Sequence, residues 1–118
     1  MPGTFTEALN GTDEITISVT GRSTGRQISM PVWFVADEDK VYLVPIYGSD
    51  SNWYRNIVAT PRLQLTADGA TVSATGTAIG DPRRVQQVVE SFRAKYGEEQ
   101  IESYYPKTDA AVEVIVPR

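Results

Sequence analysis

The residues best suited to chemistry lie in one stretch, Tyr47 to Asn56, which reads Tyr-Gly-Ser-Asp-Ser-Asn-Trp-Tyr-Arg-Asn. A glycine and three small polar residues lead into aromatic residues, an arginine and an asparagine, which is typical of a loop that enters a helix. Ser49, Asp50 and Ser51 can each cap the first turn, whose free N–H groups and positive dipole end also suit an anion. The stretch therefore predicts a binding site at the start of a short helix, at the rim of a sheet.

A second polar segment, Gly21-Arg22-Ser23-Thr24-Gly25-Arg26, adds two arginines between two glycines. The glycines permit a tight connection between strands, and the arginines can grip an anion. Solvated loop charges are the simpler interpretation of Arg22 and Arg26 taken alone.

These segments must be positioned by a mainly β fold. Period-two alternation predicts strands over 14–20, 27–36, 62–67 and 110–116. A nearly continuous apolar run predicts a further strand over 40–46, and the chain returns as a strand over 70–80. Pro31 indicates an edge strand or a bulge, and Asp68-Gly69 indicates a hairpin. Helices are predicted over 52–59, from Pro82 to the residue before Gly97, and over 98–105. The order β-β-β-α-β-β-α-α-β favours a small antiparallel split barrel with flanking helices; a flat α+β sandwich is the alternative.

Length and composition limit the function. The 118 residues suit one domain over 14–118, preceded by a mobile arm over 1–13 that Phe5 and Leu9 pin. Without cysteine or histidine the chain has no thiol nucleophile, imidazole base or ordinary metal ligand set. A net charge of −4 gives no reason to expect nucleic acid. With no signal peptide or membrane span in the pattern, a soluble cytoplasmic protein with small-molecule partners is predicted.

Four motifs together resemble the deazaflavin-dependent nitroreductase family, whose members look like flavin-binding split barrels related to pyridoxamine-phosphate oxidases. The motifs are Thr20-Gly21-Arg22-Ser23-Thr24-Gly25-Arg26, Met30-Pro31-Val32-Trp33-Phe34, Gly48 with Asn52-Trp53-Tyr54-Arg55-Asn56, and Ala59-Thr60-Pro61-Arg62. Their combination is moderately specific, and each motif alone is weak.

The resemblance implies an oxidoreductase that uses the reduced deazaflavin coenzyme F-420 to deliver a hydride to a nitro, quinone or other unsaturated acceptor. The cofactor carries such chemistry, and the protein supplies binding, orientation and water exclusion. The implied cofactor-binding residues are Arg22, Arg26, Tyr47, Gly48, Trp53 and Asn56, and the implied substrate-binding residues are Trp33, Tyr104 and Tyr105. The resemblance assigns no catalytic side chain and no metal, and split barrels of this kind often form homodimers.

This chain departs from the family pattern at three positions that usually carry polar or cationic side chains, which are Ser23, Ile28 and Tyr47. Each charge-assisted contact is worth about 1.5–3 kcal/mol, so losing two cations weakens the grip on a polyanionic coenzyme unless Arg26 or Arg55 substitutes. Two alternatives therefore stand beside the leading one: FMN in the same groove, or a non-catalytic split-barrel protein that binds another hydrophobic ligand.

Overall fold

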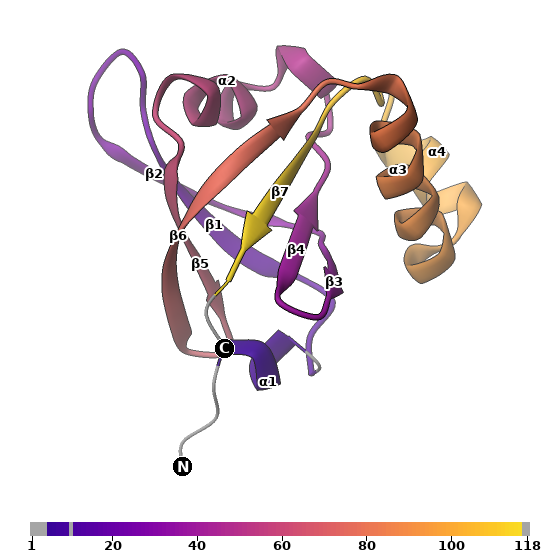
Figure 1. Cartoon of the computed structure of the whole chain (residues 1–118), viewed down its shortest axis with the longest axis horizontal. Helices are drawn as coiled ribbons and strands as arrows, with labels where there is room; N and C mark the ends of the chain where they lie inside the picture. The colour runs from indigo at the N-terminus through magenta and orange to yellow at the C-terminus, as the bar shows by residue number, and fades with distance from the viewer. Residues whose placement is uncertain (1–4, 10, 117–118) are drawn as a thin grey trace.

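The computed structural model describes residues 5–9 and 11–116, which form an antiparallel sheet with helices at its ends and on one side (Figure 1). The elements in chain order are α1 (Phe5–Leu9), β1 (Ile15–Thr20), β2 (Gln27–Val32), β3 (Val35–Asp37), β4 (Lys40–Leu43), the 3-10 turn η1 (Gly48–Asp50), α2 (Asn52–Ala59), β5 (Arg62–Ala67), β6 (Ala70–Ile79), α3 (Pro82–Tyr96), α4 (Glu98–Tyr104) and β7 (Ala111–Ile115).

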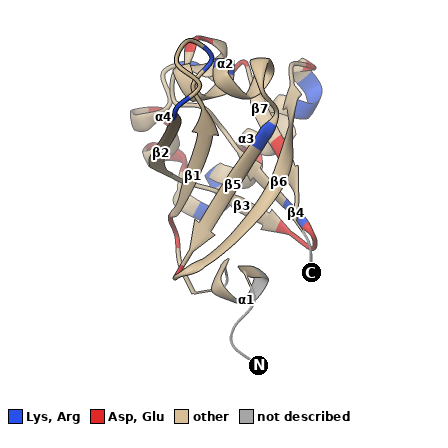
Figure 2. Ribbon diagram, turned by 90° about the vertical axis from the view of Figure 1, so that its left-hand side faces the viewer, with Lys and Arg blue, Asp and Glu red and all other residues tan. Residues whose placement is uncertain are grey.

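The seven strands are ordered β2-β1-β5-β6-β7-β4-β3, and every pair is antiparallel. The sheet curls into a half-barrel with β2 and β3 at its two edges (Figures 1 and 2). The split-barrel prediction is confirmed, and so is the edge position of the strand that carries Pro31. The Asp68-Gly69 hairpin is also confirmed, since both residues have positive φ angles, of 47° and 83°.

The long strand β6 joins the two halves of the barrel. Its first part, up to Thr75, pairs with β5, and its second part, from Gly76, pairs with β7. A Cβ atom on Gly76 would lie 2.9 Å from a methyl carbon of Leu63 and 3.1 Å from one of Val112. Gly76 is therefore the residue that lets the strand cross between the halves, where a bulge was expected.

The single strand predicted over 27–36 is wrong in one respect, because it is two strands interrupted at Trp33 and Phe34. Phe34 makes its backbone hydrogen bonds to side chains of α3 instead of to a neighbouring strand. Its N–H donates to the Tyr96 hydroxyl at 3.1 Å, and its carbonyl accepts from Lys95 Nζ at 2.8 Å. These hydrogen bonds to α3 hold the chain at the point where it passes from β2, at one edge of the barrel, to β3, at the other. The strand predicted over 40–46 also ends early, at Leu43.

Two buried apolar clusters hold the structure together. One fills the barrel, where α1 and α2 cover its ends with Phe5, Leu9, Trp53 and Ile57. The other lies beneath α3 and α4, and the predicted apolar stripe of α3 forms its centre through Val85, Val88, Val89 and Phe92. Asp81 caps α3, as expected, and Gly97 ends it with a φ of 99°.

Within the expected arm, residues 5–9 form α1, and Phe5 and Leu9 are buried in the barrel cluster. The remaining part of the arm includes residues 1–4 and 10, which lie outside the described residues, so its mobility stays a prediction. Among the helices that the structure describes, none combines the length and apolar character needed to cross a membrane.

Candidate functional site

A cavity of about 560 Å³ opens between the edge strand β2, the chain that follows β4, the start of α2 and the end of α4. Its lining is mostly apolar and aromatic. The lining residues are Glu14, Met30, Pro31, Val32, Trp33, Val44, Ile46, Tyr47, Ser51, Asn52, Trp53, Tyr104 and Tyr105. A cavity of this size, with a few polar groups among apolar walls, is typical of small-molecule sites.

Trp33 occupies one wall of this cavity and is held by aromatic neighbours. Its indole stacks on Tyr96, with ring centroids 4.3 Å apart and planes 8° from parallel. Tyr104 meets it edge-on at 5.4 Å, and Tyr105 lies at 6.1 Å. Since α3 carries Tyr96 and α4 carries Tyr104, the two helices together fix this wall.

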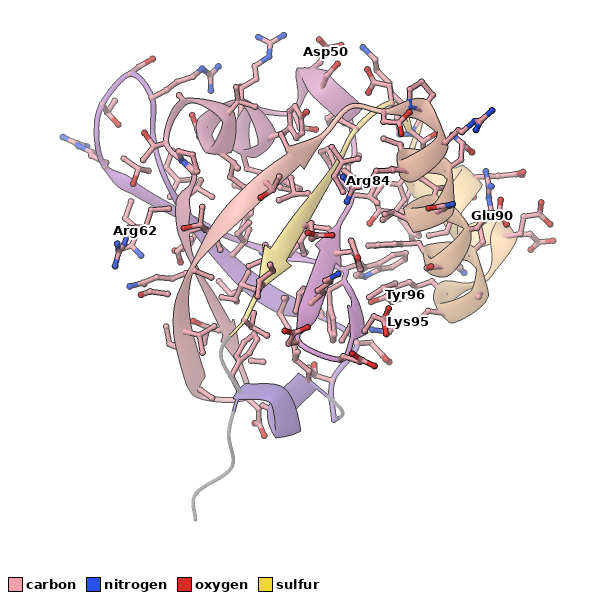
Figure 3. The ribbon with its side chains drawn as sticks, in the orientation of Figure 1. Asp50, Arg62, Arg84, Glu90, Lys95 and Tyr96 are labelled. Atoms are coloured by element: carbon pink, nitrogen blue, oxygen red, sulfur yellow. The ribbon has the colours of Figure 1, made fainter. Side chains whose placement is uncertain are left out.

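Tyr96 also joins three segments of the chain through its hydroxyl group. The hydroxyl lies 3.1 Å from the Phe34 nitrogen, 2.9 Å from the Phe34 carbonyl and 2.8 Å from the Asp13 carbonyl. Burial raises the pKa of Tyr96 to about 12, so the hydroxyl remains protonated at neutral pH. Figure 3 shows Lys95 and Tyr96 extending from α3 toward the strands.

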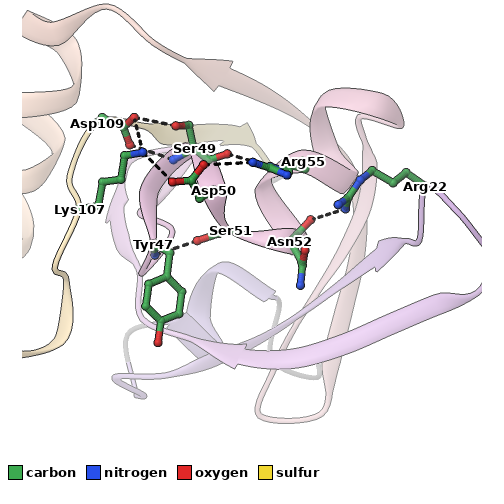
Figure 4. A network of polar contacts seen from close by, with 9 residues as sticks. All are labelled: Arg22, Tyr47, Ser49, Asp50, Ser51, Asn52, Arg55, Lys107 and Asp109. Atoms are coloured by element: carbon green, nitrogen blue, oxygen red, sulfur yellow. Dashed lines mark hydrogen bonds and ion pairs between the residues drawn. The ribbon is translucent and has the colours of Figure 1, made fainter.

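The loop before α2 is held by a polar network (Figure 4). Asp109 accepts from the Ser49 N–H at 2.8 Å and from the Ser49 hydroxyl at 2.7 Å. Asp50 pairs with Lys107 at 2.7 Å and with Arg55 at 3.1 Å. The hydrogen bond from Lys107 lowers the pKa of Asp50, and the one from Ser49 lowers the pKa of Asp109.

Side-chain capping of α2 by Ser49, Asp50 or Ser51 is a prediction that the structure contradicts. Ser51 is the N-cap residue, but its side chain makes no cap hydrogen bond and instead accepts from the Tyr47 N–H at 2.8 Å. Ser49 and Asp50 lie in the preceding 3-10 turn and bind the segment 107–109 or Arg55. Ser49 and Asp50, which local spacing predicted as capping residues of the helix, therefore bind Asp109 and Lys107 from the far end of the chain instead.

Gly48 is required by the same packing. Its φ is +58°, and a Cβ atom there would lie 2.0 Å from Asp109 Oδ1 and 2.9 Å from Lys107 Cγ. The glycine thus lets the segment 107–109 cross directly over the loop, a structural role next to the cavity.

Arg22 lies against the opposite side of α2, in the connection between β1 and β2. Its guanidinium donates to Asn56 Oδ1 at 2.8 Å and to the Asn52 carbonyl at 3.3 Å, and its backbone N–H donates to the same Asn56 oxygen at 3.1 Å. Asn56 is buried, so its side chain fastens the 21–26 connection to the helix. Arg22 consequently stands beside Asn52, one of the residues that line the cavity.

The structure brings together five of the nine predicted site residues in the cavity lining, which are Trp33, Tyr47, Trp53, Tyr104 and Tyr105. Arg22, Gly48 and Asn56 stand just behind that lining, through the contacts described above. Arg26 is exposed, and its hydrogen bonds are made by its backbone: its N–H donates to the Thr24 hydroxyl and its carbonyl accepts from the Gly21 N–H.

Two nearly buried polar groups in the lining lack a hydrogen-bond partner among the described residues. Trp53 is 6% exposed and Tyr105 is 7% exposed, yet neither the indole N–H nor the phenol hydroxyl is paired. Neither atom is fully closed off from solvent, and both residues line the cavity. Burial raises the pKa of Tyr105, which keeps it a neutral donor.

Eight lining residues were not predicted as site residues, which are Glu14, Met30, Pro31, Val32, Val44, Ile46, Ser51 and Asn52. Glu14 was taken as the start of a strand, and nothing in its neighbourhood in the sequence marks it as a site residue. It joins the cavity because Ile15 pairs with Val32, which places Glu14 beside Trp33. Strand pairing across ten or more residues is the signal needed to find it.

The curled sheet and its edge cavity define the class of small split-barrel proteins, and the comparisons agree. Solved structures with the same fold include an F420-H2 dependent reductase (FDR-A), which is 17% identical, with a TM-score of 0.67 over 86% of this chain and 93% of that one. The heme storage protein HutZ from Vibrio cholerae is 15% identical, with a TM-score of 0.71 over 96% and 87%. A putative pyridoxamine 5'-phosphate oxidase from Listeria innocua is 8% identical, with a TM-score of 0.69 over 94% and 89%.

The chain belongs to the family DUF2255, described as uncharacterized proteins conserved in bacteria, whose model matches residues 6–115. No curated protein matches it in sequence. The split-barrel fold, expected from the motifs around Arg22 and Trp53, is confirmed by the structural neighbours. At these identities the likeness concerns the fold.

Proposed function

We propose that this protein is an oxidoreductase that binds a flavin-type cofactor in the cavity and passes a hydride to a nitro, quinone or other unsaturated small molecule. The deazaflavin coenzyme F-420 is the first candidate for the cofactor and FMN the second. The observation that carries the proposal is the cavity of about 560 Å³ with Trp33 and Trp53 in its walls, because aromatic walls suit a planar ring.

In this proposal the chain's own residues bind and orient the ring. Trp53 is anchored in the barrel core, and its free indole N–H supplies a hydrogen-bond donor to the cavity. The Tyr105 hydroxyl supplies a second donor. Val44 and Trp33 exclude water from the same space. The bound cofactor would supply the redox chemistry, which the side chains of a protein without histidine or cysteine do not.

The anionic part of the cofactor would leave the cavity past Asn52, toward Arg22. The guanidinium of Arg22 is already oriented by Asn56 and by the Asn52 carbonyl, so it needs little ordering to meet a phosphate. Arg26, in the same connection, is the second cation within this segment. Arg55 does not serve as readily, because it pairs with Asp50.

The test is a titration of the purified protein with F-420 and with FMN, followed by the fluorescence of each ligand. Arg22→Ala should raise the dissociation constant of F-420 by roughly tenfold or more, the loss expected of one charge-assisted contact. The matched control is Arg83→Ala, which removes an exposed arginine at the start of α3. Equal effects of the two variants would count against the role of Arg22.

One observation favours a second candidate, a non-catalytic protein that binds another hydrophobic ligand. Among the residues that the structure describes, the cavity lining contains no lysine or arginine and one carboxylate, that of Glu14. Binding of neither F-420 nor FMN in the titration would support this candidate, and tight binding of FMN alone would indicate an FMN-dependent reductase.

A homodimer is part of the proposal. Ile46, Tyr47 and Tyr104 all border the cavity, yet their side chains are 45%, 62% and 54% exposed. A second copy would cover such an apolar rim. Light scattering coupled to size exclusion should give twice the mass of the chain; a monomer across the working concentration range would contradict this. The cytoplasmic location stays a prediction.

A further inference from the structure

The end of the cavity nearest β1 has an unusual combination of side chains. Trp33, Tyr104 and Tyr105 supply three aromatic rings, and Glu14 supplies the one carboxylate of the lining. One face of the Trp33 indole rests on Tyr96, which is not part of the lining, whereas Trp33 itself is part of it. The electron-rich faces of such rings attract cations.

Glu14 is held beside these rings by its backbone. Its N–H and its carbonyl both bond the Thr12 hydroxyl, at 3.3 and 2.9 Å, and the carbonyl of the preceding residue, Asp13, accepts from Tyr96. The side-chain carboxylate has no hydrogen-bond or ion-pair partner within the described part of the chain. Glu14 thus presents an uncompensated negative charge at the cavity wall.

One cation, Lys95, lies near this end, where its Nζ donates to the Phe34 carbonyl and faces the Phe34 ring. The cations around α2 are engaged at the other end. Lys107 pairs with Asp50 and Arg55 with the same carboxylate, while Arg22 lies on Asn56. Glu14 and Arg22 stand at opposite ends of β1, whose six residues span about 20 Å and include no charged residue (Figure 2). Among the described lining residues, the carboxylate of Glu14 therefore lies beside Trp33, and no lysine or arginine is part of that lining.

We propose that this end of the cavity recognises an aromatic cation, such as an N-alkylated pyridinium or quinolinium ring, with Glu14 as the charge partner and Trp33 and Tyr104 as the walls. As a statement about the acceptor substrate, it rests on the oxidoreductase function proposed above. As a statement about binding, it does not require that function.

Hydride chemistry agrees with a cationic acceptor. The hydride from a reduced deazaflavin or flavin forms one C–H bond at a ring carbon of the acceptor, and the two electrons it brings reduce the formal charge of that ring from +1 to zero. The donor, as its reduced anion, would lose the hydride with the same two electrons and become the neutral oxidised cofactor, so no proton is left over. No proton has to be supplied, which suits a lining whose ionisable side chains are Glu14 and three tyrosines.

The experiment is a calorimetric titration of the full chain, without cofactor and at low salt, with three probes of similar shape: N-methylquinolinium, neutral 1-methylnaphthalene and anionic naphthoate. The wild-type protein should bind the cation about tenfold more tightly than the neutral probe. Glu14→Gln should lower the affinity for the cation by about fivefold, as expected of one charge pair in water, and leave the neutral probe unchanged. High salt should lower the affinity of the wild-type protein for the cation by the same factor, because it screens the charge pair.

Glu99→Gln is the matched control, since it makes the same chemical change at an exposed position of α4 outside the lining. Equal binding of the cation and the neutral probe, equal effects of the two variants, or no binding of any probe would overturn the inference. Reduction is measured separately, with reduced F-420 and N-methylquinolinium. Selective binding without reduction would count against the proposed function alone, whereas reduction of neutral and cationic acceptors with the same KM would count against the inference alone.

Discussion

At the scale of single residues, Asn56 shows how one side chain can serve both the fold and the site. The sequence allows two roles for Asn56, one as a side chain that fastens a loop and one as a contact to the cofactor. The structure shows the first, because the buried amide oxygen accepts from both the backbone and the guanidinium of Arg22. A contact of Asn56 with a cofactor stays a prediction.

Asn56→Ala should lower the free energy of unfolding by about 1–3 kcal/mol, because it leaves the partly buried Arg22 N–H without its acceptor. Urea denaturation measures this change. Asn52→Ala is the control, since Asn52 is exposed and holds Arg22 through its backbone carbonyl. A similar loss in both variants would show that the Asn56 side chain does not fasten the connection.

Tyr96 is the residue on which the Trp33 wall depends. Tyr96→Phe keeps the stacked ring but removes hydrogen bonds to Phe34 and Asp13, and we expect a loss of about 1–3 kcal/mol in stability. The chain contains two tryptophans, and both line the cavity, so a shift in intrinsic fluorescence should accompany the loss. Tyr104→Phe, at an exposed hydroxyl without a described partner, should leave stability unchanged.

At the scale of elements, the transfer of β6 between the halves of the barrel depends on Gly76. Gly76→Ala should destabilise the protein by about 1–3 kcal/mol, because the new methyl group meets Leu63, Val112 and Ile57 within 3.2 Å. Gly80→Ala is the matched control, since a Cβ atom there has nothing within 4 Å. Thermal unfolding of the two variants side by side gives the comparison, and equal midpoints would contradict the crossing role.

At the scale of the whole molecule, the network around Lys107 ties the chain before β7 to the loop before α2. The pKa values of Asp50 and Asp109 are both lowered from 3.8, so each carboxylate stabilises the folded state above that pH. Their contribution is lost as the pH falls through the lower, folded-state values. Urea midpoints of Asp109→Asn should therefore decline less steeply below pH 3.8 than those of the wild type; parallel curves would exclude a contribution from Asp109.

At alkaline pH, the stability of the folded state falls as the pH rises, opposite to its dependence in acid. Because the pKa of Tyr96 is raised from 10.0 to about 12, its contribution to stability is fully present below pH 10 and is lost as the pH rises toward 12. Tyr96→Phe should remove this part of the alkaline loss. Urea midpoints measured across that interval test it, and an unchanged slope would assign the loss to other groups.

The sequence alone determined the features that short-range physics controls. Alternation located the strands, the apolar stripe of Val85 to Phe92 located α3, and Asp68-Gly69 located a hairpin, because each depends on neighbours a few residues away. It also pointed to Trp33 and Trp53, through a pattern of residues typical of a family.

Tertiary structure decided the rest. It placed Glu14 beside Trp33, and it brought Arg22 into hydrogen-bond contact with Asn56. It also paired Ser49 with Asp109 and Asp50 with Lys107, so that neither Ser49 nor Asp50 caps the helix. These contacts join residues between 19 and 60 positions apart, so their formation depends on the curl of the whole sheet, which no local spacing records.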